Sequence, residues 1–406
     1  MKRPELLSPA GDREKLETAL AYGADAVYLA GEEFGMRCAS ENFSEDSIAD
    51  AIAYAHKRGA AVYVTLNTMP RNDEVARLPA FLEVLESAGA DAVIVADIGV
   101  MTAVKKYAPN VKIHISTQAS IVNYQSANAW HELGADRIVL ARELSLDEIR
   151  EIRAKTPAKL EIETFVHGAM CMSYSGRCML STYMTGRDST RGRCAQPCRW
   201  KYAVVEEKRP GEYYEICEDG KGTYIFNSKD MCMIEHIPEL IDAGIDSFKI
   251  EGRFKSAFYN ATITNAYRMA IDSYLECPEK WNPKGPWSEE VHKVSHREYF
   301  TGFYFRETPS EYHRDSMYIR DWDVAAVVLD CDVDGKARIS VRNRFFSGDD
   351  LELLEPKKET CAFKAELFDL DGEPLEVARH AKMEAHITLP RQAVAGAMLR
   401  VRRGEE

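Results

Sequence analysis

The sequence predicts a TIM-type (β/α)8 barrel followed by a small all-β domain. Short apolar runs rich in β-branched residues alternate with amphipathic helical segments along the first part of the chain. A helix that ends at glycine and leads directly into such a run recurs, as in GADAVYL, GADAVIV and GIDSFKI. Strands this apolar are typical of parallel sheets covered on both faces. Eight such units predict a closed barrel, and an open doubly wound sheet is the alternative.

Eight segments carry the pattern of a buried parallel strand. They are Glu5–Leu7, Ala26–Leu29, Ala61–Leu66, Ala92–Ala96, Lys112–Ser116, Arg137–Leu140, Leu160–Phe165 and Ser247–Ile250. Helical segments with one apolar face stand between them, at Asp12–Tyr22, Ser47–Arg58, Val75–Ala88 and Ser145–Lys155. No G-x-G-x-x-G or G-x4-G-K-S/T loop follows any of these strands, which argues against a nucleotide-binding open sheet.

The chain makes a detour of roughly eighty residues between the seventh and eighth predicted strands, far longer than a loop of about 2–6 residues. This detour carries an insertion at about 169–222, in which 202–221 alternates and contains a Pro-Gly turn typical of a hairpin. After the barrel domain (1–276) we expect a linker with helical and aromatic stretches (277–322). From 323 to 406, short alternating strands with Asp-Gly turns predict a C-terminal β-barrel domain of about six strands.

Polar and charged residues follow the predicted strands. Active sites of this barrel gather at the carboxyl ends of its strands, so we expect these residues to meet around one mouth. The candidates for binding substrate are Arg37, Asn67, Gln118, Arg142 and Arg253. The candidates for catalysis are Glu163, His167, Lys229 and Glu251. Each has a structural alternative, such as a surface lysine at a helix start for Lys229 or a solvated ion pair with Glu143 for Arg142.

The stretch Glu163–Tyr202, called the cysteine segment below, holds Cys171, Cys178, Cys194 and Cys198 in the spacing C-x6-C-x15-C-x3-C. Four thiolates complete the coordination of zinc or of an iron–sulfur cluster. The long gaps fit the tight knuckles of structural zinc poorly, and ferredoxin-type runs are absent. We therefore expect an iron–sulfur cluster, with zinc or ordinary buried thiols as alternatives. Cys232 is the main rival for a place among the four ligands.

The composition is that of an ordinary globular protein, with 45% hydrophobic and 29% charged residues. The N-terminus lacks the apolar core of a secretory signal, and no segment approaches the ~18 apolar residues of a membrane span. We expect a cytoplasmic protein without a membrane partner, whose cysteines are metal ligands or free thiols. The formal net charge of −13 argues against a surface that coats nucleic acid throughout.

Two local basic groups could nevertheless hold phosphates. The first lies in the cysteine segment, with only Asp188 to oppose it: Arg177, Arg187, Arg191, Arg193, Arg199 and Lys201. The second lies in the C-terminal domain and includes Arg342, Arg344, Arg400 and Arg402, which either face RNA or form a solvated face. Tyr174, Tyr183 and Trp200 could stack on bases, with core packing as the alternative.

The run from Glu163 to Ser181, ETFVHGAMCMSYSGRCMLS, resembles the signature of peptidase family U32. Further stretches that carry the resemblance are LSPAGD, GRCAQPCRWKY, NSKDM and KIEGR, so it covers essentially the whole chain. Within the family the chain is most similar to the branch that makes 5-hydroxyuridine at the wobble position of certain tRNAs. That similarity implies a 4Fe-4S cluster, prephenate as co-substrate, a tRNA anticodon loop as partner and room for a homologous partner subunit.

If prephenate takes part, its two carboxylates need cationic partners, for which Arg37, Lys229 and Arg253 are the candidates. Two other classes of function stay open. A collagenase-like peptidase needs an activated nucleophile, and a pair of Cys171 with His167 would compete with metal binding for the same thiolate. No H-E-x-x-H or G-x-S-x-G motif supports proteolysis. The third class is a non-catalytic RNA-binding protein with structural zinc.

Overall fold

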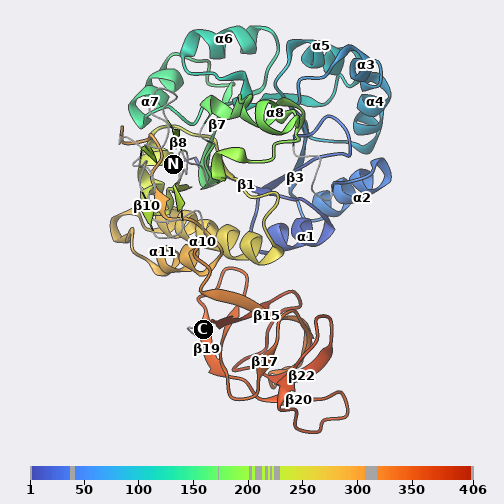
Figure 1. The fold of residues 1–406 in the computed structure, drawn as a ribbon, viewed down its shortest axis with the longest axis vertical. Coiled ribbons are helices and arrows are strands. Elements are labelled where there is room, and N and C mark those ends of the chain that lie inside the picture. The colour runs from blue at the N-terminus through green and yellow to red at the C-terminus, as the bar shows by residue number, and fades with distance from the viewer. Residues whose placement is uncertain are drawn as a thin grey trace. The chain divides into compact units, whose positions relative to one another are not determined.

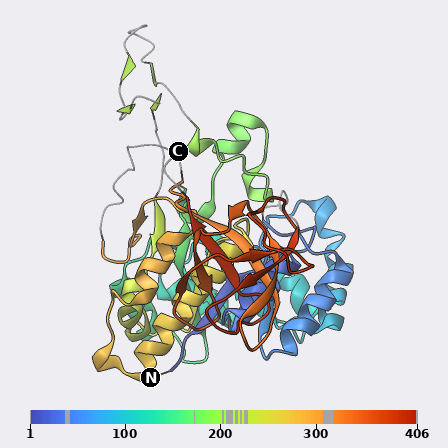
Figure 2. The same ribbon diagram turned by 90° about the horizontal axis from the view of Figure 1, so that it is seen from below.

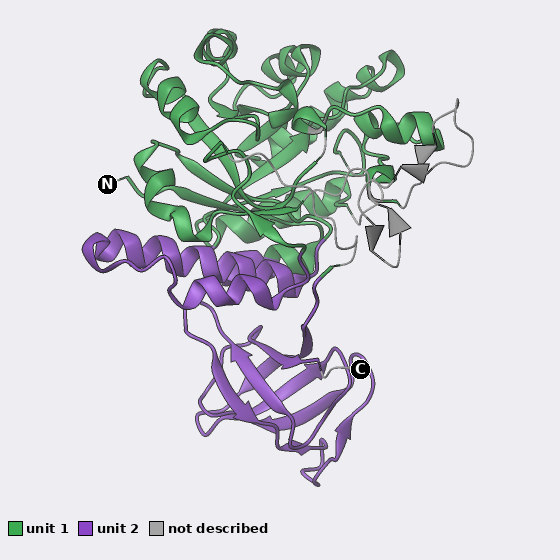
Figure 3. Cartoon of the chain, turned by 60° about the vertical axis from the view of Figure 1, so that its left-hand side comes forward, with its two compact units in different colours: residues 1–16, 24–254, 297–318 green, residues 17–23, 255–296, 319–406 purple. Residues whose placement is uncertain are grey.

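The structure, a computed structural model, describes residues 2–36, 42–171, 173–200, 204–205, 213–214, 218–219, 222–223, 229–306 and 318–403. The chain forms two compact units (Figure 3). The barrel unit comprises Met1–Leu16, Ala24–Phe254 and Arg297–Tyr318, and the second unit comprises Glu17–Gly23, Lys255–His296 and Ile319–Glu406. The predicted domain limits (1–276, 277–322 and 323–406) stay predictions, because a compact unit is not by itself an independently folding domain.

Parallel strands close a TIM-type barrel in the first unit, as predicted (Figure 1). They are β1 (Glu5–Pro9), β2 (Ala26–Leu29), β3 (Ala61–Leu66), β4 (Ala92–Val95), β5 (Lys112–Ile115), β6 (Arg137–Val139), β7 (Glu161–Ala169) and β13 (Ser247–Ile250). Neighbours in this order pair in parallel, and β13 pairs with both β1 and β7. Closure leaves no free edge and places all carboxyl ends at one mouth.

Helices surround these strands (Figure 1). They are α1 (Arg13–Ala21), α2 (Glu45–His56), α3 (Asn72–Val75), α4 (Leu78–Ala88), α5 (Ile98–Tyr107), α6 (Tyr124–Glu132), α7 (Leu146–Ala154) and α9 (Ile237–Asp242). Polar side chains such as Ser44, Asp97 and Ser145 accept hydrogen bonds from the first turns of the helices that follow. The glycine of GADAVIV, Gly89, ends α4 at φ 76°, a left-handed conformation that glycine adopts without strain.

The cysteine segment forms short helices, namely η2 (Tyr174–Gly176), α8 (Leu180–Thr185), η3 (Ser189–Arg191) and η4 (Pro197–Arg199). In Figure 2, turned by 90°, α8 (green) rises from one end of the barrel. Beyond it, β8 (Val204–Val205) pairs antiparallel with β9 (Tyr213–Tyr214), which confirms the predicted hairpin. The strands β10 (Glu218–Asp219) and β11 (Gly222–Thr223) form a second pair.

Two short strands extend the barrel sheet next to β7. The strand β12 (Asp230–Cys232) runs antiparallel to the end of β7, and β14 (Tyr299–Phe300) runs parallel to β12. The sequence did not indicate either of them, because two or three residues of mixed polarity carry no periodicity.

The second unit holds the helices α10 (Ala257–Glu276) and α11 (Pro286–Glu290) and an antiparallel half-barrel sheet. The sheet order is β19 (Cys361–Lys364), β18 (Asp350–Leu354), β23 (Met398–Arg402), β15 (Trp322–Cys331), β16 (Lys336–Val341), β22 (Glu384–Thr388) and β20 (Leu367–Phe368). A further pair joins β17 (Phe345–Phe346) and β21 (Val377–Ala378). The predicted all-β domain is therefore confirmed, and within the described residues its main sheet has seven strands where about six were expected.

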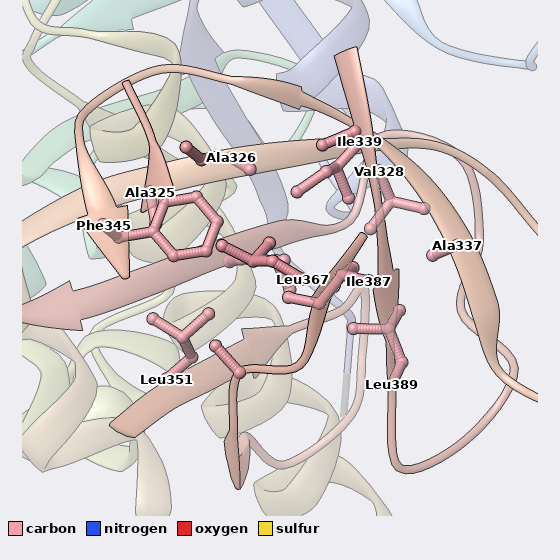
Figure 4. Packing of buried hydrophobic residues seen from close by; sticks show 14 of the residues in the cluster. Ala325, Ala326, Val328, Ala337, Ile339, Phe345, Leu351, Leu367, Ile387 and Leu389 are labelled. Carbon is pink, nitrogen blue, oxygen red and sulfur yellow. The ribbon is translucent and has the colours of Figure 1, made fainter. Parts of the chain in front are cut away.

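The core of this sheet is wholly apolar. Side chains such as Val328, Ile339, Leu367 and Ile387 point toward one another between the strands (Figure 4). Alternation along β16 explains the pattern, because every second residue is buried. None of the helices in the described part of the chain combines the length and apolar character needed to cross a bilayer.

Candidate active site

A network of buried charges, here called the polar floor, fills the barrel interior. It consists of Glu5, Arg137, Glu163 and Lys249. Nη1 of Arg137 lies 2.6 Å from Oε1 of Glu5 and 3.0 Å from Oε2 of Glu163, and Nζ of Lys249 lies 2.8 Å from Oε1 of Glu163. The Glu163 side chain has no solvent exposure. Each charge is tolerated at this depth because opposite charges contact it directly.

The pKa values in this network follow from the same contacts. Burial opposes the charge on Arg137, yet attraction by Glu5 and Glu163 outweighs it and raises the Arg137 pKa. Burial also opposes the charge on Glu5, but Arg137 outweighs it and lowers the Glu5 pKa. His114 is different: burial and then repulsion from Arg137 and Lys249 lower its pKa well below 6.5. His114 therefore stays neutral beside the cations.

A cavity of about 440 Å³ opens at the carboxyl ends of the barrel strands. Strand residues Tyr28, Thr65, Phe165 and Lys249 line it, and Lys249 joins it to the polar floor. The segments that follow the strands add several of the predicted residues: Asn67, Gln118, Arg142, Glu251 and Arg253. The structure thus brings these five together, as expected for a barrel mouth.

Three cations on the cavity wall are held in place by neighbouring groups. Arg142 donates from Nη1 to the Ala169 carbonyl over 2.9 Å, and its guanidinium lies 3.7 Å from the Phe165 ring centroid. Arg253 donates to Thr65 Oγ1 over 3.3 Å and to the carbonyl of Met36. The Lys249 ammonium lies 4.6 Å from the Tyr28 ring centroid. Fixed cations in a mainly apolar cavity favour a small anionic ligand.

Two carboxylates complete the polar wall. Glu251 is 8% exposed, and its Oε2 lies 3.8 Å from Nη2 of Arg142. Gly168 permits this arrangement, because its φ is 108° and a Cβ there would lie 2.4 Å from the Glu251 carbonyl oxygen. Glu143 accepts hydrogen bonds from the backbone N–H and Oγ of Ser175, over 2.6 and 2.7 Å. This pair fastens the cysteine segment to the loop after β6.

All four predicted thiols, Cys171, Cys178, Cys194 and Cys198, line the same cavity. The backbone N–H of Leu180 points at the Cys178 sulfur and that of Gln196 at the Cys194 sulfur, each over 3.3 Å. Such N–H···S bonds stabilise a thiolate and tune a metal bound to it. The donors therefore fit a thiolate-held metal in kind. Within the described residues, however, no group of three or more donors stands close enough to hold a metal ion.

Cys232 does not line the cavity. It lies on β12 directly opposite His167 of β7. The structure thus places Cys198, rather than its rival, beside the other three thiols. Which of them binds a metal stays a prediction.

Three predicted catalytic residues lie off the cavity wall. Glu163 is enclosed in the polar floor, and Lys229 forms an ion pair with Glu298 over 3.0 Å. His167 is 1% exposed, and its Nε2 lies 3.4 Å from the Tyr299 hydroxyl. A register shift between β7 and β13 pairs His167 with Ile250, the neighbour of cavity-facing Lys249. Neighbouring strand residues face opposite sides, so His167 turns away from the cavity.

Arg37, predicted to bind substrate, lies outside the described residues. Lys249 was not among the predicted site residues. The sequence does indicate it, because a lysine inside the apolar run SFKI is unusual unless it is paired with an opposite charge. Of the predicted stacking residues, Tyr174, Tyr183 and Trp200 are 51%, 91% and 44% exposed. Core packing is therefore excluded for Tyr183.

A closed parallel barrel with polar side chains gathered at the carboxyl ends of its strands is the arrangement of (β/α)8 enzymes. The chain matches the model of "Peptidase family U32" over residues 11–314 and that of "Peptidase family U32 C-terminal domain" over residues 320–400. The chain belongs to this family, which confirms the resemblance.

Characterised relatives are named for RNA modification. The "tRNA hydroxylation protein P1" of Bacillus subtilis is 40% identical over 98% of this chain and 95% of its own length. The "tRNA hydroxylation protein P" of Escherichia coli is 35% identical, over 93% of this chain and 92% of its own. A 23S rRNA 5-hydroxycytidine synthase of E. coli is 40% identical over 68% of this chain and 40% of its own. The prediction of an enzyme is thereby confirmed.

Proposed function

We propose that this enzyme hydroxylates RNA, converting the wobble uridine of certain tRNAs into 5-hydroxyuridine with prephenate as co-substrate and a 4Fe-4S cluster as cofactor. One observation carries the proposal: four thiols and three fixed cations line a single cavity at the barrel mouth. The names of the B. subtilis and E. coli relatives support tRNA as the substrate class.

Cys171, Cys178, Cys194 and Cys198 would hold the cluster. When bound, an iron–sulfur cluster supplies one-electron transfer. The chain contributes the surroundings of the thiols. The N–H groups of Leu180 and Gln196 stabilise the negative charge on sulfur, and the bond between Glu143 and Ser175 keeps the segment against the barrel.

Arg142, Lys249 and Arg253 would receive the two carboxylates of prephenate. All three cations line the cavity, and packing against rings or hydrogen bonds to the backbone restricts their motion. Such preorganisation lowers the entropic cost of binding a dianion. Of the cations first expected in this role, Arg253 lines the cavity, whereas Lys229 is paired with Glu298. Lys249 and Arg142 would bind the prephenate carboxylates together with Arg253.

A uracil base reaches the cavity only after it leaves the stack, which the single-stranded anticodon loop allows. A cavity of about 440 Å³ falls within the size range of small-molecule sites. The amide groups of Asn67 and Gln118 can pair with the donors and acceptors on the uracil edge. Glu251, beside Arg142, is the carboxylate on the wall to which we assign the role of proton acceptor.

Mass spectrometry of tRNA nucleosides tests the reaction. Deletion of the gene should remove 5-hydroxyuridine, and the wild-type gene should restore it. Cys171→Ala should fail to restore it, because a cluster thiolate is lost. Cys361→Ala is the matched control, since this thiol lies in the sheet of the second unit, and it should restore the nucleoside fully. Unchanged 5-hydroxyuridine in the deletion strain would overturn the proposal.

Metal analysis of protein purified without air separates the cofactor alternatives. Iron and acid-labile sulfide in equal amounts, about four of each per chain, are expected of a 4Fe-4S cluster. Zinc without sulfide would favour the structural alternative. The peptidase alternative has less support from the geometry, because His167 contacts Tyr299 while Cys171 lines the cavity. Casein cleavage that is lost in Cys171→Ala would revive it.

A further inference from the structure

The outer face of the cysteine segment exposes large apolar side chains beside arginines. Met179, Tyr183 and Met184 are 59%, 91% and 45% exposed, and Arg187 and Arg193 are also exposed. These five residues are called the rim face. Met179 and Tyr183 are one helical turn apart, because the Tyr183 N–H donates to the Met179 carbonyl. Single exposed apolar residues are common, but a cluster of them marks an interaction surface.

The rim face is built on a fixed scaffold. The hydroxyl of Ser181, which is fully buried, donates to the Arg187 carbonyl over 2.8 Å and accepts from the Ala195 N–H over 2.9 Å. Ser189 donates to the Cys178 carbonyl in the same way. The Arg193 N–H donates to the Asp188 carbonyl, which brings the two exposed arginines onto neighbouring backbone. The exposed side chains therefore project from an ordered platform.

The charge of this platform opposes that of the rest of the chain. Residues 171–200 contain five arginines and one acidic residue, whereas the whole chain carries −13. The one acid, Asp188, accepts hydrogen bonds from the N–H and hydroxyl of Thr190. Among the described residues, no ion pair or hydrogen bond engages the guanidinium group of Arg187 or of Arg193. Both guanidinium groups are available to an anionic partner.

The same segment turns its other face to the cavity. Cys178 and Leu180 line the cavity, whereas Met179 between them points outward. A nucleotide that enters the cavity leaves its chain neighbours at the mouth, which the cysteine segment borders. Rings and thioethers offer surfaces to unstacked bases, and arginines contact the phosphates between them.

We infer that the rim face is the docking surface for the single-stranded RNA nucleotides that flank the modified base. The inference rests on the proposed function and deepens it, because it names the surface that receives the substrate. A second copy of the chain would also cover apolar residues. The two arginines favour RNA, because their positive charge attracts phosphates. Residues 171–200 are positively charged although the chain as a whole carries −13.

Fluorescence anisotropy with a labelled tRNA anticodon stem–loop and purified full-length protein tests the inference. The double variant Arg187→Glu/Arg193→Glu should bind at least about tenfold more weakly, with a shallower dependence of log K on log salt. Tyr183→Ala should lose about 5- to 100-fold, the range for one stacked base. The matched controls are Arg379→Glu and Leu370→Ala, exposed residues of the second unit, and both should bind within about twofold of wild type.

Wild-type affinity in the rim variants would overturn the inference. So would a dimer in sedimentation that Tyr183→Ala dissociates, because the rim would then be covered by a second copy. If the deletion strain lacks 5-hydroxyuridine while the rim variants bind normally, only the docking surface is wrong. If the deletion strain keeps the nucleoside, the proposed function itself has failed.

Discussion

The barrel interior and the core of the C-terminal sheet bury different kinds of side chain. The sheet core is built from alanine, valine, leucine, isoleucine and phenylalanine alone. The barrel interior buries Arg137, Glu163 and Lys249 beneath a cavity. Burying charges costs more free energy than burying methyl groups, and paired charges often stabilise no more than apolar residues of the same size. In the barrel these charges lie directly beneath a cavity, so we assign them to binding and chemistry.

The largest effect is expected at Arg137. Arg137→Leu leaves Glu5 without its counter-charge and leaves Glu163 with Lys249 alone, so the free energy of unfolding should fall by about 3–5 kcal/mol. Chemical denaturation measures this loss. Arg338→Leu is the control from the sheet, because Arg338 pairs with Asp330 and Glu384 in solvent. Equal losses of unfolding free energy in the two variants would show that burial of Arg137 does not increase its contribution to stability.

A smaller effect is expected in the sheet core. Ile339→Val removes one methylene from a fully buried side chain and should lower the free energy of unfolding by about 1 kcal/mol. The 5-hydroxyuridine content of tRNA, corrected for the amount of folded protein, should not change. A lower 5-hydroxyuridine content per folded protein would mean that the sheet core takes part in the reaction, as the barrel interior is expected to do.

The smallest effect is expected from pH. The His114 pKa is far below 6.5 in the folded barrel, so the unfolded chain gains a proton near this pH that the folded chain does not. Its contribution to stability is therefore full above pH 6.5 and declines as the pH falls below it. Glu5 adds nothing in this window, because it titrates below 4.5. Denaturation at about pH 7 and about pH 6 should show this decline in wild type, and His114→Gln should weaken it. An identical decline in both proteins would contradict the assignment.

The eight barrel strands could be predicted because each is a short apolar run that follows a glycine or polar turn. The residues at their carboxyl ends followed from closure of the barrel, which is why Asn67, Gln118, Arg142, Glu251 and Arg253 share a cavity. Pairing irregularities could not be predicted. The register shift that turns His167 toward Tyr299 depends on contacts between strands distant in sequence.

Ion pairs between residues distant in sequence could not be predicted either. Arg400 reads as part of a basic surface, yet it is fully buried between Glu290 and Glu352. Neither suggested role, RNA contact or solvated face, applies to it. Its partners lie 110 and 48 positions away, so no local pattern could reveal them. The same holds for Lys249 and Glu163, which are 86 positions apart.

The most direct test measures stability and activity separately for Glu163 and Lys249, the ion pair through which the polar floor reaches the cavity. The double variant Glu163→Gln/Lys249→Met removes the Glu163–Lys249 ion pair while keeping its volume. Arg137 loses Glu163 but keeps its ion pairs with Glu5 and Glu161, so the chain should fold with nearly wild-type stability. The double variant also removes a cation from the cavity wall, so it should restore at least about tenfold less 5-hydroxyuridine to the deletion strain, as expected for one lost charge-assisted contact. A folded double variant that restores the wild-type level would contradict the claim that these charges are buried to serve the cavity.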